Sequence, residues 1–215
     1  MAKLILLRHL ESQWNSENRF TGWTDVPLSE EGVKSAKGVA GKLVGFEIDK
    51  IYTSPLIRNR ESVSLILENL GKVKEDKSSS SPFTNARVKD LPVVIDKALD
   101  ERNYGKLQGL NKDEMKAKYG EEQVRLWRRS WGEAPPGGES LKDVFKRAVP
   151  FYQKYIEKDL KEGKNVLIVA SHNSLRALVK YIEKISDKDI INLEIPTGGL
   201  IEYEVDDSLK IHPVK

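Results

Sequence analysis

The sequence predicts an α/β protein built on a mostly parallel sheet. Strand-like runs alternate with helix-like segments along most of the chain, and two of the three histidines directly follow apolar, β-like runs. Residues 4–7 (LILL) precede Arg8 and His9, and residues 166–171 (VLIVAS) precede His172. Ligands of open parallel sheets bind beyond the carboxyl ends of the strands. Two imidazoles brought together there, with arginines beside them, would form an anion site that contains a candidate nucleophile.

The composition favours one globular domain over residues 1–215. The chain has 36 Lys and Arg against 33 Asp and Glu, and a net charge of +3 gives no argument for nucleic acid or a membrane as a partner. The absence of cysteine excludes disulfides and thiolate metal sites and fits a reducing compartment. The apolar run at residues 4–7 indicates a strand and not a signal peptide, and no segment has membrane-spanning length. We therefore expect a cytoplasmic protein.

After the first strand, residues 10–28 form a polar loop that is too long to be a passive connection. Ser29 can cap a helix over residues 30–44, whose two opening glutamates suit the positive end of the helix dipole. Residues 46–53 then form a second strand. The alternation of strand and helix begins here and indicates a parallel sheet.

Ser54 and Pro55 are typical of an N-cap and a first helical residue, so we expect a helix from there to about residue 70. The mixed charges and serine run of residues 71–90 predict an exposed insertion. The remaining pattern predicts, in order, a strand at 93–99, helices at 111–131 and 139–161 with a kink at Pro150, the strand before His172, helices at 174–183 and 187–192, and strands at 199–205 and 209–213.

Several motifs together resemble the cofactor-dependent phosphoglycerate mutases of the histidine phosphatase superfamily. Residues 8–15 (RHLESQWN) are similar to that family's opening R-H-G-E-S-x-W-N. The other matching strings are residues 20–29 (FTGWTDVPLS), 53–58 (TSPLIR), 101–112 (ERNYGKLQGLNK), 127–129 (WRR) and 138–141 (GESL). The resemblance implies a three-layer α/β/α fold of the phosphoglycerate mutase type.

By this resemblance, the protein interconverts 2-phosphoglycerate and 3-phosphoglycerate through a phosphohistidine primed by 2,3-bisphosphoglycerate, without a metal. His9 is then the nucleophile, and protonated His172 offsets negative charge during transfer. Glu101 exchanges the proton of the substrate hydroxyl. Two further groups follow from the resemblance. The phosphoryl oxygens are held by Arg8, Asn15 and Arg58, and the rest of the substrate by Ser12, Thr21, Gly22, Arg102, Tyr104, Lys112, Arg128, Arg129 and Asn173.

The chain departs from the family pattern at two sensitive positions. Leu10 stands where the family has glycine after the nucleophilic histidine. The family string A-H-G-N-S-L-R corresponds to residues 170–176 (ASHNSLR), where alignment from Asn173 puts Ser171 in the place of the histidine. Alignment from the strand keeps His172 there and deletes the glycine. We prefer the second alignment, because the strand end fixes the geometry and serine cannot carry positive charge.

Two other functions remain open: a phosphohistidine-dependent phosphatase of the same superfamily, and a non-catalytic protein that binds phosphorylated ligands. The short stretch at residues 131–139 implies a monomer or homodimer, because longer family members carry an extra segment there. The tail at residues 206–215 could close the site and favour transfer over hydrolysis. We expect Trp14 and Trp23 to pack and His212 to lie on the surface.

Overall fold

The computed structural model describes residues 1–76, 91–206 and 209–214. Within these residues the chain forms one sheet of six strands in the order β3-β2-β4-β1-β5-β6. The strands are β1 (Ala2–Arg8), β2 (Lys50–Thr53), β3 (Val93–Ile95), β4 (Val166–Ala170), β5 (Leu200–Val205) and β6 (Ile211–Pro213). The first four strands run parallel, and β5 and β6 are antiparallel to their neighbours. The predicted mostly parallel sheet is confirmed.

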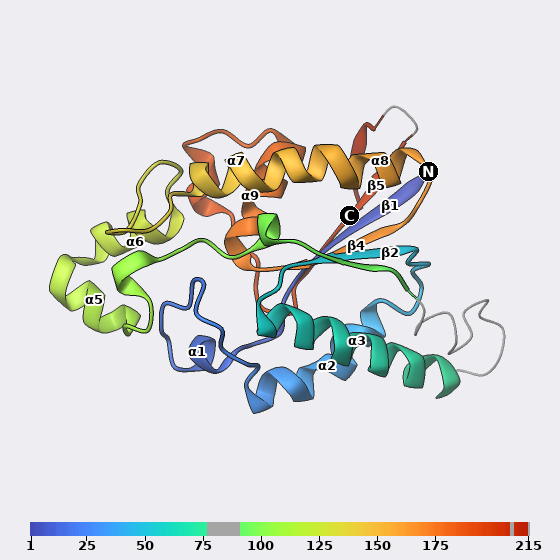
Figure 1. Ribbon diagram of the computed structural model, residues 1–215, viewed down its shortest axis with the longest axis horizontal. Helices are drawn as coiled ribbons and strands as arrows, with labels where there is room; N and C mark the ends of the chain where they lie inside the picture. Colours follow the sequence, from blue (N-terminus) through green and yellow to red (C-terminus); the bar gives the residue numbers. More distant parts are fainter. Residues whose placement is uncertain (77–90, 207–208, 215) are drawn as a thin grey trace.

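Helices cover both faces of this sheet, and Figure 1 shows the three layers. On one face, Ile5, Leu7 and Val169 pack against α2 (Glu30–Lys42) and α3 (Ile57–Asp76). On the other, Leu6 and Ile168 pack against the remaining large helices, α7 (Leu141–Phe151), α8 (Glu157–Lys161) and α9 (His172–Glu183). Successive side chains of each strand point to opposite helical layers. Because both layers are apolar, the central strands are continuous runs of apolar residues in the sequence.

The register of the two central strands places both histidines at one edge of the sheet. β1 and β4 are parallel neighbours, with Arg8 opposite Ala170. The His9 amide donates a 3.1 Å hydrogen bond to the Ala170 carbonyl. The residues that follow the two strands therefore emerge side by side.

Smaller elements surround this edge of the sheet. They are α1 (Gln13–Ser16), α5 (Lys112–Tyr119), α6 (Glu121–Arg129) and the single turns at Lys97–Leu99, Gly105–Leu107 and Asp189–Asn192. Figure 1 shows α5 and α6 beyond the end of the sheet, away from the chain termini. The predicted helix at 111–131 is thus two helices. Gly120, with φ of +87°, separates them, because a left-handed residue ends a helix.

Other boundaries also differ from the prediction. The strand expected at 93–99 ends at Ile95, because the Asp96 side chain accepts the Ala98 amide at 2.7 Å and starts a 3₁₀ turn. The helix expected from Pro55 begins at Ile57, whose amide donates to Asp25 at 2.6 Å. This helix continues to Asp76, so the exposed insertion predicted at 71–90 begins as helix; its residues 77–90 lie outside the described part.

The helix expected at 139–161 contains the predicted irregularity after Pro150. The chain makes a π-helical turn at Tyr152–Ile156 between α7 and α8. Proline has no amide hydrogen and crowds the preceding turn, which explains the changed hydrogen-bond spacing.

The described tail lies at the opposite end of the sheet from the two histidines. Val205 pairs with Ala2 at the start of β1, and Ile211 pairs with Val205. The expectation that this tail closes the site is wrong for its described residues. No helix among the described residues is long and apolar enough to cross a membrane.

Candidate active site

A polar pocket opens at the carboxyl ends of β1 and β4. It combines side chains from the two strand ends, the loop around α1, the start of α3, the segment after β3, the two helices α5 and α6, and the start of α9. Its lining residues are Arg8, His9, Asn15, Arg19, Phe20, Thr21, Gly22, Arg58, Glu101, Tyr104, Lys112, Arg128, Arg129, His172, Asn173 and Glu194. Among the described residues, no three His, Asp or Glu side chains are grouped to hold a metal ion.

His9 is held as a neutral imidazole with one defined tautomer. Its Nδ1 lies 2.6 Å from the Leu10 carbonyl oxygen, which can only accept, so Nδ1 carries the hydrogen and Nε2 keeps its lone pair. Burial, together with the charges of Arg58 and Arg8, holds the pKa of His9 well below its ordinary value. A neutral Nε2 surrounded by cations is suited to attack an anionic phosphoryl group.

Leu10 fits this site without a special backbone conformation. It is not among the residues of positive φ, so a glycine is not needed for backbone freedom. Its amide donates to Ser62 Oγ at 2.9 Å, and its fully buried side chain joins the apolar cluster between the sheet and α2. The side chain that replaces the family glycine thus packs into the core.

The structure places His172 in the pocket, and Ser171 behind it. Ser171 is the N-cap of α9, is fully buried, and lies 3.2 Å from Asn59 Nδ2. His172 is therefore the first residue of a helix that was expected to begin at residue 174. Its Nε2 lies 3.3 Å from both Arg129 Nη1 and Glu194 Oε1. Burial lowers the pKa of His172 to about 4, although the hydrogen bond to Glu194 and the charge of Glu101 favour the protonated ring.

The two arginines predicted to hold the phosphoryl group, Arg58 and Arg8, are both anchored to main-chain carbonyls; Arg58 is fully buried and Arg8 partly buried. Arg58 donates from Nη2 to the Gly22 carbonyl at 2.7 Å, and Arg8 from Nη1 to the Ile195 carbonyl at 2.6 Å. Gly22 has φ of +58°, and a Cβ there would meet the Gln108 side chain at 2.2 Å. Arg8 Nε and Thr21 Oγ1 are buried and have no protein partner. Buried polar atoms normally find partners, so these two atoms indicate that the pocket is built for a polar ligand.

Glu101 points one oxygen at fixed donors. Its Oε1 accepts hydrogen bonds from the Arg102 amide at 2.6 Å and from Asn173 Nδ2 at 2.9 Å. Burial opposes its charge, but His172 and Arg58, together with these hydrogen bonds, lower the pKa of Glu101 below its ordinary value. The carboxylate is thus oriented through Oε1 and favours its ionised form.

Ser12 and Arg102 were predicted to bind substrate, but neither lines the pocket. Ser12 is fully buried and forms a capping box with Asn15, whose side-chain oxygen accepts from Ser12 Oγ at 2.9 Å. Arg102 is also fully buried, and its Nη2 donates to the Arg128 carbonyl and, at 3.2 Å, to Tyr104 Oη. Both therefore act by orienting residues that do line the pocket.

Three of the pocket's cations come from α5 and α6. Lys112 begins α5, and Arg128 and Arg129 end α6. Burial and the nearby arginines lower the pKa of Lys112 to about 8, and burial also lowers that of Arg128. These helices therefore add positive charge to the pocket, and the charge of Arg129 is paired with Glu194.

Sequence reasoning missed three lining residues: Arg19, Phe20 and Glu194. Glu194 is half exposed at the mouth of the pocket and forms ion pairs with Arg129 and, at 3.8 Å, with Arg8. Burial opposes its charge, but His172 and Arg129 lower the pKa of Glu194 to about 2. One signal could have located it: β5 runs antiparallel to β1, so the loop before β5 must lie at the carboxyl end of β1.

The other aromatic and histidine predictions have mixed outcomes. Trp14 is half-buried, and its ring lies close to Gly109: a Cβ added to Gly109 would be 3.3 Å from the ring. Trp23 is 47% exposed and donates from Nε1 to the Glu101 carbonyl at 2.6 Å, so its expected role in packing is wrong. His212 is on the surface, as predicted.

Comparison with known proteins identifies relatives over nearly the whole chain. The model of the histidine phosphatase superfamily (branch 1) matches residues 4–78 and 83–211. The chain is 45% identical to a 2,3-bisphosphoglycerate-dependent phosphoglycerate mutase of Methanococcus vannielii, over 96% of this chain and 92% of the relative. It is 42% identical to the protein of the same name from Cytophaga hutchinsonii, over 100% of this chain and 92% of the relative.

Solved structures show the same fold. A mycobacterial glucosyl-3-phosphoglycerate phosphatase in complex with VO3 has a TM-score of 0.80 and 24% identity, covering 100% of this chain and 98% of that one. At this identity the likeness concerns the arrangement of helices and strands.

Proposed function

The chain belongs to the histidine phosphatase superfamily (branch 1), and from this premise we propose that it is a phosphoglycerate mutase that depends on 2,3-bisphosphoglycerate. It interconverts 2-phosphoglycerate and 3-phosphoglycerate, two isomers that differ in which oxygen carries the phosphoryl group. The observation that carries this proposal is the neutral, tautomer-fixed His9 in a pocket lined by six lysine and arginine side chains.

His9 accepts and returns the phosphoryl group. Nε2 attacks phosphorus while the bond to the donor oxygen breaks, and the reverse step delivers the group to the other hydroxyl of the bound molecule. Arg8 and Arg58 hold the phosphoryl oxygens, because guanidinium groups match phosphate with paired hydrogen bonds. Their anchoring to main-chain carbonyls keeps their remaining donors aimed into the pocket.

His172 changes its charge when the anion arrives. A phosphoryl group between His9 and His172 places negative charge beside a ring whose pKa is low through burial, and this charge favours protonation. The position at the first turn of α9 adds amide dipoles that favour an anion. The protonated ring and these dipoles stabilise the charge on the equatorial oxygens during transfer.

Glu101 exchanges the proton of the reacting hydroxyl. The hydroxyl that attacks phosphohistidine loses a proton, and the one that gives up its phosphoryl group gains one. Because Oε1 accepts bonds from Arg102 and Asn173, the other carboxylate oxygen serves both steps.

The pocket fits a molecule with anionic groups at two ends. Arg8 and Arg58 would hold the anionic group that reacts with His9, and Lys112, Arg128 and Arg129 would hold the carboxylate or outer phosphate. When bound, 2,3-bisphosphoglycerate supplies the phosphoryl group that converts His9 into phosphohistidine.

Turnover of 3-phosphoglycerate coupled to enolase tests this proposal, with and without trace 2,3-bisphosphoglycerate and with EDTA in the mutase step. We expect EDTA-resistant turnover that the bisphosphate stimulates. Labelled bisphosphate should transfer phosphate to the parent and to His212→Asn, a matched control at an exposed histidine, but not to His9→Asn. Release of free phosphate without isomerisation would indicate a phosphatase, and no reaction in either assay would indicate a ligand-binding protein.

A further inference from the structure

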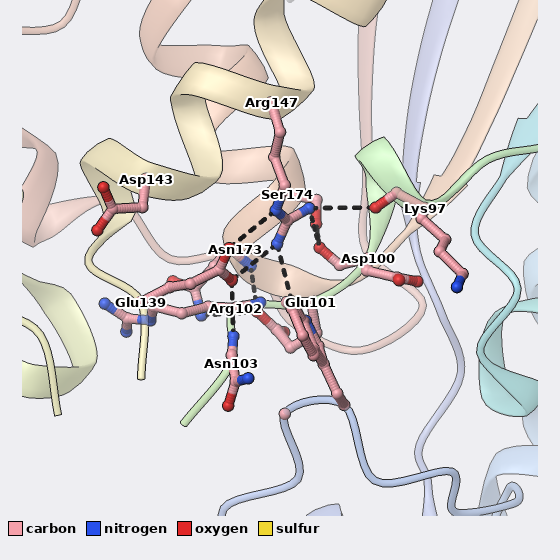
Figure 2. A network of polar contacts seen from close by, with 12 residues as sticks. Lys97, Asp100, Glu101, Arg102, Asn103, Glu139, Asp143, Arg147, Asn173 and Ser174 are labelled. Carbon is pink, nitrogen blue, oxygen red and sulfur yellow. Dashed lines mark hydrogen bonds and ion pairs between the residues drawn. The ribbon is translucent and has the colours of Figure 1, made fainter. Parts of the chain in front are cut away.

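The main chain that carries Glu101 is held from outside the pocket by one guanidinium group. Arg147, on α7, donates from Nη1 to the carbonyl oxygens of Ala98 at 2.9 Å and Asp100 at 2.8 Å. Its Nη2 donates to the Glu101 carbonyl at 2.9 Å. Figure 2 shows Arg147 reaching from the helix towards this segment. Arg147 does not line the substrate pocket.

Glu139 fixes the direction of this guanidinium group. Arg147 Nε lies 3.1 Å from Glu139 Oε1, and Nη2 lies 3.0 Å from Oε2. Glu139 Oε2 also accepts the Asn103 amide at 2.8 Å. The side chains of Arg147 and Glu139 are only 22% and 19% exposed, so this two-point ion pair is partly shielded from water. The pair therefore holds the chain on both sides of Glu101.

The Glu101 carbonyl oxygen receives a second donor from another element. Trp23 Nε1 donates to it at 2.6 Å, so Trp23 and Arg147 hold the same oxygen. The carboxylate of Glu101 is held separately, by Arg102 and Asn173. The main chain and the side chain of this residue are thus fixed by different partners.

We propose that Arg147 is a positioning residue that holds Glu101 where its carboxylate can exchange a proton with the reacting hydroxyl. This inference rests on the proposed function for the role of Glu101. A planar guanidinium can donate to several carbonyls and a carboxylate at once, and the single ammonium of lysine cannot reproduce that spread. Loss of the contact frees the main chain of Glu101 without touching the phosphate-binding cations.

Arg147→Lys tests this inference by its effect on kcat and KM. A displacement of about 1 Å in a reacting group can lower turnover about a hundredfold. We expect kcat to fall ten- to a hundredfold, with KM and the calorimetric Kd for inorganic phosphate within threefold of the parent. Lys146→Gln, an exposed neighbour on α7, is the matched control and should leave all three unchanged. Millimolar guanidinium should restore part of the turnover of Arg147→Ala.

Trp23→Phe provides a second, milder variant that keeps an aromatic ring and removes the Nε1 donor. We expect kcat to be three- to tenfold lower in Trp23→Phe than in the parent. In the double variant Trp23→Phe and Arg147→Lys, the fall in kcat should be smaller than the product of the two single effects, because both residues hold one oxygen. If Arg147→Ala fails to fold, Arg147→Lys and Trp23→Phe still test whether these contacts position Glu101. A kcat within twofold of the parent in both would overturn the inference, as would losses of kcat and phosphate affinity that run together.

A titration of the Glu101 carboxyl by NMR separates this inference from the proposed function, since it needs no turnover. In Arg147→Lys the displaced main chain should weaken the hydrogen bonds of the Glu101 carboxylate to Arg102 and Asn173, so the pKa of Glu101 should be higher than in the parent. The charged and titratable groups that face it, Arg8, Arg58, Tyr104 and His172, are the same in both proteins. If the pKa of Glu101 is the same in Arg147→Lys as in the parent, Arg147 does not position Glu101, whether or not the protein is active. If the pKa of Glu101 is higher in the variant but the parent has no mutase activity, only the proposed reaction is wrong.

Discussion

Replacement of Leu10 tests how the protein accommodates a large side chain beside its nucleophile. The Leu10 side chain is fully buried among the residues between the sheet and α2, and its backbone is outside the left-handed region. Truncation of a buried leucine to alanine costs about 2–5 kcal/mol, because the cavity adds to the lost transfer energy. A glycine at an ordinary backbone conformation costs about 0.5–1 kcal/mol more, because it gains entropy in the unfolded chain.

We therefore expect stability to fall in the order parent, Leu10→Ala, Leu10→Gly, although glycine is the residue of the family motif. Urea unfolding measures this, and with a slope of about 2–3 kcal/mol per molar urea the alanine variant should lose roughly 1–2 M in midpoint. Leu110→Ala, at a leucine that is 38% exposed, is the control and should change stability by about 0.5 kcal/mol or less. A glycine variant more stable than the alanine variant would refute the conclusion that the backbone of Leu10 is unstrained.

Three further outcomes follow from the structure. His172→Ala should lower turnover about a hundred- to a thousandfold in the coupled assay, whereas Ser171→Ala should stay within about threefold, since only His172 faces the pocket; the reverse result would restore the alternative alignment. The free energy of unfolding should decrease as the pH falls from 6.5 to 4, by up to about 3 kcal/mol from His172 alone. The reason is that the pKa of His172 is about 4 in the folded protein, so the unfolded chain binds the proton first. Urea unfolding between pH 4.5 and 7 should show a weaker pH dependence of stability in His172→Gln than in the parent. Gly105→Ala should destabilise the protein by at least about 2 kcal/mol, because φ is +53° and the new Cβ would lie 2.4 Å from main-chain atoms. Gly41→Ala, in open space on α2, should instead stabilise the protein by about 0.5–1 kcal/mol. Thermal melting should show a lower Tm for the first variant and a higher Tm for the second.

The order of elements and the meeting of the two histidines could be predicted from the sequence, because both follow from local patterns. Residues 4–7 and 166–170 are all apolar, which is typical of strands buried on both faces. Parallel strands align their carboxyl ends, so adjacency of the two strands was enough to join the histidines. Errors arose where a side chain competes with the main-chain ladder, as Asp96 does at the end of β3.

The supporting contacts could not be predicted, because they join residues far apart in the chain. Arg147 lies 46 residues from Glu101, and nothing in its local pattern distinguishes it from the other cations of α7. Glu194 depends on the direction of β5, which alternation of apolar residues does not specify. Ser12 and Arg102 show a related limit: the motif includes them, but only the fold shows that they orient other residues.

The charge balance of the pocket bears on whether a phosphoryl group is transferred or lost to water. Six cationic side chains line it against two carboxylates, Glu101 and Glu194, and burial lowers the pKa of Arg8, Arg58 and Arg128. Repulsion among these cations destabilises the protein without ligand, and a bound anion reduces this repulsion. Bound polyanions should therefore stabilise the fold by mass action. Cations near His9 alone would suffice for hydrolysis of a phosphate ester. Under the proposed function, the cations on α5 and α6 hold the other end of the molecule while its phosphoryl group resides on His9, and a molecule held in this way remains available to take the group back.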